Sequence, residues 1–225
     1  MNSLNRKVIF NWGTRFLVLS ALLFLPAGSL AFPRGWAFLA VYFPPQTFMV
    51  VYFLRTDPAF VERRLKIGPR AETRPRQKFV MALVILSSFA SISIAGFDHR
   101  FTWSHISLPI SIAACVVMLV GIAIQFRVFV ENSFASATIE IAADQKVIVT
   151  GPYAFIRHPM YFGALLTDFC IPLALGSWWA LLPLAAKVPV IVLRLLDEET
   201  FLRANLSGYP EYCQKVPHRL IPALW

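Results

Sequence analysis

The chain has 225 residues, of which 57% are hydrophobic and 15% are charged. With a mean hydropathy of +0.62, this composition is too apolar for an ordinary soluble domain and indicates an integral membrane protein. The net charge of +9 is concentrated in short segments between apolar runs. That distribution is typical of membrane topology signals and anionic headgroup contacts, and it argues against nucleic-acid partners.

Four apolar segments recur along the first half of the chain, each near the length that a spanning helix needs. They are Phe16 to Phe32, Gly35 to Leu54, Phe79 to Phe97 and Ser107 to Phe126. We predict four transmembrane helices and no strands, because no segment sustains period-two alternation. A cleaved signal peptide is the alternative for the first segment, and we favour a retained helix because apolar segments keep recurring after it.

The distribution of Lys and Arg predicts the orientation of the chain. Residues 55–78, between the second and third apolar segments, form a strongly basic loop, whereas the opposite connections carry Arg34 and Arg100. The positive-inside rule places this loop and both termini in the cytoplasm. A short amphipathic helix on anionic headgroups is expected within the loop.

A second apolar stretch runs over residues 161–196 and is interrupted near Gly176-Ser177. It predicts a helical hairpin whose two ends emerge on the same side, which would bring His158 and Glu198 together. Asp168 and Lys187 lie at nearly equal distances from the turn, so an antiparallel pairing would set them at similar depth. We expect a buried ion pair there; the alternative is that Lys187 snorkels while Asp168 faces a polar cavity.

The segment around Arg157-His158-Pro159 carries the densest chemistry of the chain. Arg and Tyr at a membrane interface are often simple anchors. However, Pro159 disfavours helical geometry at His158 and suits the start of a helix, so the segment would deliver Arg157 and His158 to a helix N-terminus, which favours anions. Asp197, Glu198 and Glu199 form an acidic cluster that favours a bound cation, with Arg194 or Arg203 as the internal alternative.

Several familiar sites are absent from the sequence. It contains no G-x-G, no P-loop and no H-E-x-x-H. The three cysteines form no CxxC pair, and His99, His105 and His218 lack a ligand spacing, so no metal site is expected.

Two separated motifs carry a resemblance to a known family. The first is G-P-Y-x-x-x-R-H-P-x-Y-x-G, starting at Gly151, and the second is E-E-x-x-L, starting at Glu198. They are followed by Tyr209, Tyr212 and a terminal Ile221-Pro222. This order, over about residues 147–222, resembles the isoprenylcysteine carboxyl methyltransferases and the related phospholipid methyltransferases.

The resemblance implies an S-adenosylmethionine site at the cytoplasmic membrane face. The implied cofactor-binding residues are Tyr153, His158, Pro159, Tyr161, Glu198 and Glu199. For an acidic substrate, a guanidinium from Arg157 or else Arg203 is the predicted catalytic group, because it can orient a carboxylate without protonating it. Methyl transfer needs mainly alignment of the reactants, so neither a triad nor a metal is expected.

We therefore predict an all-α integral membrane enzyme in one integrated domain, with residues 1–130 forming the four spans and residues 131–225 the catalytic region. The expected substrate is lipophilic and reaches the site from the membrane lipids, and the leading class is the carboxylate of a prenylated or lipidated thiol compound. A phosphatidylethanolamine-type amine methyltransferase, an NADPH-dependent steroid-type reductase and a non-catalytic scaffold stay open. Steroid-type reductases typically have Asn where this chain has Met160 and an acid where it has Ala164.

Overall fold

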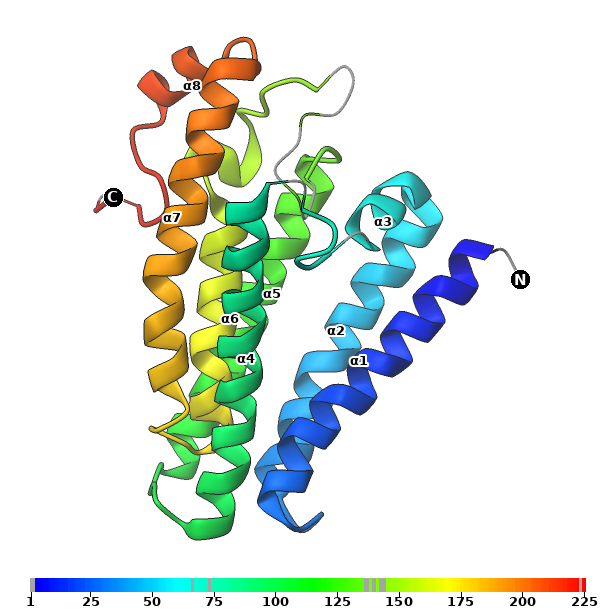
Figure 1. The fold of residues 1–225 in the computed structure, drawn as a ribbon, viewed down its shortest axis with the longest axis vertical. Coiled ribbons are helices and arrows are strands. Elements are labelled where there is room, and N and C mark those ends of the chain that lie inside the picture. Colours follow the sequence, from blue (N-terminus) through cyan, green and yellow to red (C-terminus); the bar gives the residue numbers. More distant parts are fainter. Residues whose placement is uncertain are drawn as a thin grey trace.

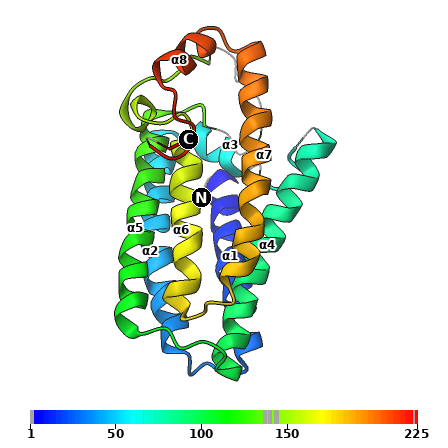
Figure 2. The same cartoon turned by 90° about the vertical axis from the view of Figure 1, so that its left-hand side faces the viewer.

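The computed structural model describes residues 3–65, 67–72, 74–135, 138, 141, 145–222 and 224–225. The described residues fold into helices packed along one long axis (Figures 1 and 2). The α-helices are α1 (Ser3–Ala27), α2 (Pro33–Thr56), α3 (Pro58–Leu65), α4 (Pro75–Phe101), α5 (Leu108–Glu131), α6 (Pro159–Leu175), α7 (Leu181–Asn205) and α8 (Tyr209–Lys215), and η1 (Gly151–Ala154) is a 3₁₀ turn.

Four of these helices are long and apolar enough to cross a membrane among the residues that the structure describes: α1, α2, α4 and α5. Each overlaps one of the four predicted spans, so the all-helical architecture with four candidate spans is confirmed. The bounds differ most for the first span, because α1 covers Ser3–Ala27 and the prediction was Phe16 to Phe32. The predicted hairpin region contains α6 and α7, and α7 continues beyond residue 196 to Asn205. The short helix expected in the basic loop is α3.

The closest helix packing joins α5 and α6, which run side by side in both views (Figures 1 and 2). Gly121 and Gly163 face each other at the crossing. A Cβ built on Gly121 would lie 2.8 Å from the carbonyl oxygen of Gly163, and one built on Gly163 would lie 2.9 Å from that of Gly121. Small residues permit this approach of two backbones in a membrane, where packing rather than the hydrophobic effect drives association.

The turn between α6 and α7 is fixed by polar groups that hydropathy does not reveal. Gly176 ends α6 at φ +89°, and a Cβ there would collide with the guanidinium of Arg34. The next residue, Ser177, donates a hydrogen bond of 2.5 Å to the buried carboxylate of Asp98 in α4. Asp98 also accepts hydrogen bonds from the backbone and hydroxyl of Ser104. These contacts hold the turn against the end of α4.

The predicted ion pair between Asp168 and Lys187 is present. The Lys187 ammonium lies 2.5 Å from a carboxylate oxygen of Asp168 and donates a second hydrogen bond of 2.9 Å to the hydroxyl of Ser88. The Lys187 side chain is buried, whereas that of Asp168 keeps about a quarter of its surface exposed. The pair therefore ties α6, α7 and α4 together in their apolar parts.

Because a stranded charge in an apolar setting costs more than the removal of both charges, we expect the two residues to behave as a unit. Asp168→Asn and Lys187→Met should each lower the melting temperature in detergent, and the double variant should recover part of the loss. Thermal melting of the four proteins of this cycle measures the coupling. Strict additivity of the two losses would show that the charges are energetically independent.

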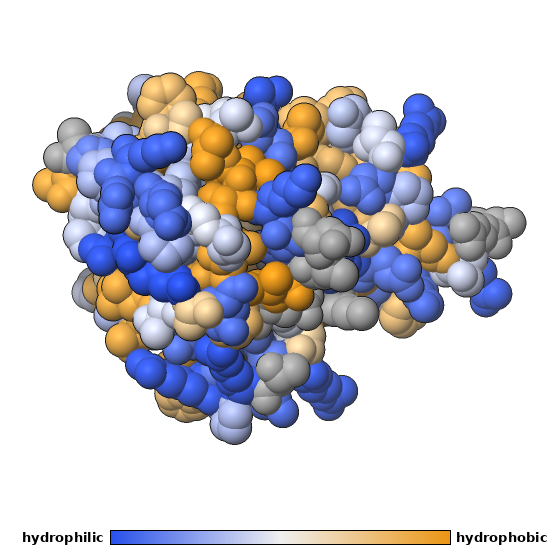
Figure 3. All heavy atoms as spheres, turned by 90° about the horizontal axis from the view of Figure 1, so that it is seen from above, coloured by the Kyte–Doolittle hydropathy of each residue, from blue (hydrophilic) through white to orange (hydrophobic). Residues whose placement is uncertain are grey.

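One end of the bundle collects the segments that carry the sequence motifs. The end of α7, α8 and the C-terminal segment lie in the same half of the molecule as α3 and the start of α1 (Figure 1). Seen from this end, the surface is largely hydrophilic, with apolar patches near its middle (Figure 3). The other end carries the short connections between helices.

Candidate functional site

The site is built around the start of α6. His158 is the N-cap residue and Pro159 the first residue of the helix, as the sequence predicts, so the direction of the segment is fixed. The backbone N–H groups of Arg157 and His158 donate hydrogen bonds of 3.0 and 2.9 Å to the carbonyl oxygens of His218 and Arg219. The motif is thereby paired with the C-terminal segment, which lies some sixty residues further along the chain.

Arg157 lies inside the protein and not in an open cleft. Its Nε donates a hydrogen bond of 2.6 Å to Glu199, and its Nη1 donates to the carbonyl oxygens of Cys213, Val216 and Pro217 at 3.4, 3.0 and 3.2 Å. The residue is 6% exposed. The guanidinium thus pins the segment after α8 to the end of α7.

Glu199 is the centre of this buried charge cluster. Besides Arg157, it contacts the Nε2 atom of His158 at 3.3 Å and accepts a hydrogen bond of 3.1 Å from Arg219. Burial by itself would raise the pKa of Glu199, but the hydrogen bonds and charges of His158 and Arg157 outweigh it and lower the pKa to about 2. The carboxylate is therefore ionised at every pH of physiological interest.

The two neighbouring acids point to different partners. Glu198 accepts a hydrogen bond of 2.6 Å from the hydroxyl of Tyr161, which in turn accepts one of 3.1 Å from Arg194. Asp197 faces α4, where the amide of Gln77 donates a hydrogen bond of 2.5 Å to it. Successive residues of a helix are rotated by about 100°, so three adjacent carboxylates reach three different environments.

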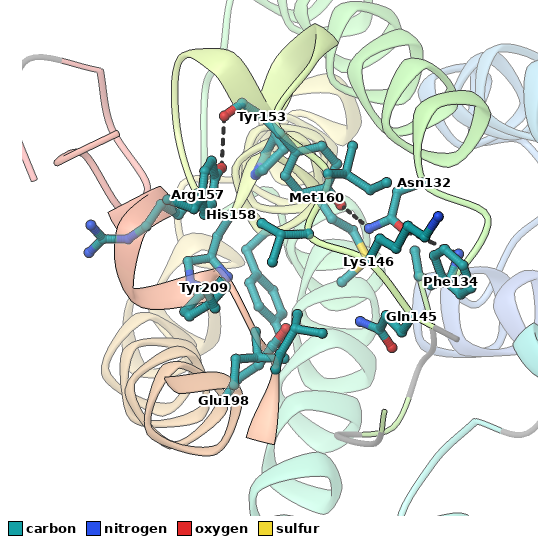
Figure 4. Close-up of a pocket in the computed structure, with 18 of the residues that line it drawn as sticks. Asn132, Phe134, Gln145, Lys146, Tyr153, Arg157, His158, Met160, Glu198 and Tyr209 are labelled. Carbon is teal, nitrogen blue, oxygen red and sulfur yellow. Dashed lines mark hydrogen bonds between the residues drawn. The ribbon is translucent and has the colours of Figure 1, made fainter. Parts of the chain in front are cut away.

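Between these elements lies a pocket, with Tyr153, His158, Tyr209 and Glu198 on one side and Asn132, Lys146 and Gln145 on the other (Figure 4). The same view shows the Arg157 guanidinium directed away from the pocket. The lining consists of Asn132, Phe134, Ala135, Thr138, Gln145, Lys146, Val147, Ile148, Tyr153, Arg157, His158, Pro159, Met160, Tyr161, Glu198, Leu202, Leu206, Tyr209 and Tyr212.

Four tyrosines give this pocket its aromatic character. The hydroxyl of Tyr153 accepts a hydrogen bond of 2.9 Å from Asn132, and burial raises its pKa to about 12, so the phenol is protonated at neutral pH. Tyr212 donates a hydrogen bond of 2.7 Å to the carbonyl oxygen of Tyr153. Tyr209 also lines the pocket, and its buried hydroxyl lies beside the thiol of Cys213.

The pocket gathers most of the residues that the sequence singled out. Tyr153, His158, Pro159, Tyr161 and Glu198 line it, as does part of Arg157. In contrast, Glu199 is not among the lining residues, and Arg203 is exposed and also lies outside the lining.

Sequence reasoning missed Asn132 and Lys146, which complete the opposite wall. Both come from the polar stretch after the fourth span. That stretch contains no motif. The only signal in the sequence that could have pointed to these residues is the change from an apolar composition in the fourth span to a mixed, polar composition after it.

The fold and the site define a class: a helical protein whose described residues include four candidate membrane spans, with an aromatic pocket of mixed charge at one end of the bundle. Two comparisons with known proteins bear on this class. Residues 109–207 match the model of the phospholipid methyltransferase family, which confirms the resemblance drawn from the motifs. The matched segment runs from α5 to just beyond the end of α7, so it contains both motifs and leaves α1 to α4 outside.

A curated relative of this chain is named as a reductase and not as a methyltransferase. The chain is 27% identical over 134 residues to the Delta(14)-sterol reductase TM7SF2 of Mus musculus, a match that covers 53% of this chain. The match covers 32% of the reductase, so this chain spans about a third of the length of that relative.

Proposed function

We propose that the protein transfers a methyl group from S-adenosylmethionine to a lipophilic substrate at one face of a membrane. The observation that carries the proposal is the pocket in which Glu198 and the tyrosines meet between the two motifs. The match of residues 109–207 to the phospholipid methyltransferase family supports it.

The residues of the pocket suit this cofactor. Its cationic ammonium and its ribose hydroxyls can bind to the Glu198 carboxylate, and its sulfonium can lie against the aromatic faces of Tyr153 and Tyr209. The Lys146 side chain at the opposite wall can receive its carboxylate. When bound, the cofactor would supply an electrophilic methyl group, and the residues around it would contribute position and exclusion of water.

The contacts of Arg157 and Glu199 suggest a division of roles within the two motifs. Because both side chains are buried and pair with each other, we propose that they position the pocket walls and do not contact ligands. His158 would act in the same way through its contact with Glu199. The catalytic roles predicted for Arg157 and Arg203 stay predictions, and these contacts and the exposure of Arg203 speak against them.

The proposed substrate is the carboxylate of a prenylated or similarly lipidated thiol compound. A carboxylate needs no base to act as a nucleophile, whereas an ammonium group must first lose a proton. The contact of His158 with Glu199 and the hydrogen bond from Tyr161 to Glu198 leave both groups engaged within the protein. This engagement favours a substrate that is already ionised.

We place the pocket on the cytoplasmic side. Helix α3, which carries part of the basic segment, lies in the same half of the molecule as α8 (Figure 1), and α8 contributes Tyr209 and Tyr212 to the pocket. Clusters of Lys and Arg in short loops are retained on the cytoplasmic side of membranes. Both termini would then be cytoplasmic as well.

The product identifies the reaction. Membranes that contain the protein should transfer label from methyl-labelled S-adenosylmethionine to extracted lipids, and mild base should release most of that label as methanol, because esters hydrolyse and C–N bonds do not. Glu198→Gln membranes are the matched control and should incorporate much less label at the same cofactor concentration. Base-stable label in lipid headgroups would contradict the carboxylate substrate and assign an amine.

A reductase is the second candidate, because a sterol reductase is among the relatives. Calorimetric titration of the purified protein with S-adenosylmethionine and, separately, with NADPH distinguishes the two. Binding of NADPH without binding of S-adenosylmethionine would overturn the methyltransferase proposal.

A further inference from the structure

A second cavity lies between α1, α2 and α3 and ends close to the pocket. Its volume is about 320 Å³, which falls at the small end of the range of roughly 300–1,000 Å³ for ligand sites. Its walls are mainly apolar, with Trp12 from α1, Met49 and Val50 from α2, and Leu65 from α3. Such a lining suits a hydrocarbon chain.

Two arginines interrupt this apolar lining. Arg15 of α1 hydrogen-bonds to the hydroxyl of Tyr42 and lies 5.4 Å from the centre of the Trp12 ring. Arg64 of α3 lies 4.6 Å from the centre of the Phe129 ring. Burial lowers the pKa of the Arg64 guanidinium to about 10, so it is still charged at neutral pH. A guanidinium that lines an apolar cavity can offer hydrogen-bond donors to an anion bound there.

Helix α3 holds Arg64 in this position. The carboxylate of Asp57 caps the helix by accepting a hydrogen bond of 2.9 Å from the N–H of Phe60. The Phe60 ring packs on Phe53 and Phe129, with ring centres 4.6 and 5.3 Å apart. Arg64 follows Phe60 by four residues and so lies on the same face of α3. The anchored helix therefore presents the guanidinium to the cavity.

Arg64 also stands at the boundary with the pocket. Its Nη1 lies 3.7 Å from the sulfur of Met160, and Met160 lines the pocket beside His158. Phe129, which lies under the guanidinium, precedes the pocket residue Asn132 by one helical turn of α5. A head group bound to Arg64 would thus be separated from the pocket by one flexible side chain.

We propose that this cavity binds the hydrocarbon tail of a single-chain anionic amphiphile, and that Arg64 binds its head group beside the pocket. The inference rests on the proposed function in one respect, namely that the bound amphiphile is the methyl acceptor. The cavity is formed by α1 to α3 together with the end of α5, so it lies mostly outside the segment that matches the phospholipid methyltransferase family. The part of the chain outside the family match would then select the substrate.

The test uses a fluorescent acid and its neutral counterpart. We expect the protein, in a neutral detergent, to bind 11-(dansylamino)undecanoic acid about 10- to 100-fold more tightly than the methyl ester of the same compound, since a hydrogen bond to a charged group is worth roughly 1.5–3 kcal/mol. Arg64→Gln should abolish that preference while leaving the affinity for the ester unchanged. Dansyl fluorescence measures both affinities without added cofactor.

Matched variants keep the test independent of folding. Arg76→Gln removes an exposed arginine near the start of α4 and should leave both affinities unchanged. Arg64→Lys keeps the charge and should retain part of the preference for the acid. Val50→Trp should weaken the acid and the ester alike, because it fills the cavity. Melting temperatures near that of the original protein establish that each variant is folded.

Any one of three results would overturn the inference. The first two are equal affinities for the acid and the ester in the original protein, and an unchanged preference for the acid in folded Arg64→Gln. The third is displacement of the acid by equimolar phosphatidylglycerol, which would show that a bilayer lipid occupies the cavity. S-adenosylmethionine titrations in the same preparations separate this inference from the proposed function. If the protein binds no S-adenosylmethionine but still prefers the acid over the ester, the methyltransferase proposal is contradicted and the amphiphile site is supported.

Discussion

Replacing Glu199 by glutamine is expected to lower the free energy of unfolding by about 3–5 kcal/mol, because removal of one partner of a buried ion pair leaves the other charge uncompensated. The stranded charge is that of Arg157, whose Nε lies 2.6 Å from Glu199 and whose side chain is 4% exposed. Thermal melting in detergent measures the loss. Glu211→Gln, at an exposed position in α8, is the matched control and should shift stability by less than about 0.5 kcal/mol.

The same contact makes a pH-dependent contribution whose sign follows from the pKa. The pKa of Glu199 is about 2 in the folded protein against an ordinary value of 4.5. A carboxylate with a lowered pKa stabilises the fold above the ordinary value and loses that contribution as the pH falls through the folded value. The contribution is about 3 kcal/mol at neutral pH and should disappear between about pH 4.5 and pH 2.

The Glu199→Gln protein should not lose this contribution of about 3 kcal/mol between about pH 4.5 and pH 2, because it has no carboxylate to protonate. The Glu211→Gln protein should lose it as the original protein does. A Glu199→Gln protein that melts like the original at neutral pH would show that the buried cluster contributes little. It would also remove the basis for the proposal that Arg157 and Glu199 position the pocket walls.

The second large effect concerns the neighbouring residue. Glu198→Gln is expected to weaken binding of S-adenosylmethionine by about 10- to 100-fold, because it removes the charge from a hydrogen bond worth roughly 1.5–3 kcal/mol. The melting temperature should stay near that of the original protein, because glutamine keeps an oxygen that can accept the hydrogen bond from Tyr161. Calorimetric titration measures the affinity.

Asp197→Asn is the matched control for this change, since Asp197 contacts Gln77 and Arg74 of the α4 end and does not line the pocket. It should bind the cofactor normally. Equal affinities of the Glu198→Gln and original proteins would contradict the assignment of Glu198 to the cofactor. Together with the stability of Glu199→Gln, these measurements test whether adjacent acids have separate roles.

Hydropathy and charge were sufficient to predict the architecture. The four spans, the helices of the 161–196 region and the meeting of the two motifs follow from local patterns, because the length of an apolar run and the position of a turn are properties of contiguous residues. Even the pair of Asp168 and Lys187 was predictable, since an antiparallel pair of helices fixes which positions lie at equal depth. The sequence alone therefore determined the class of protein and the neighbourhood of the site.

The roles within the site depended on tertiary structure. Three consecutive acids look equivalent in the sequence, yet Asp197 faces α4, Glu198 the pocket and Glu199 the buried Arg157. The direction of each side chain depends on how α7 is rotated against its neighbours, and that rotation is set by packing between segments far apart in the chain. For the same reason no local pattern in the basic 55–78 segment distinguishes Arg64, which α3 places between two cavities, from the exposed Arg76.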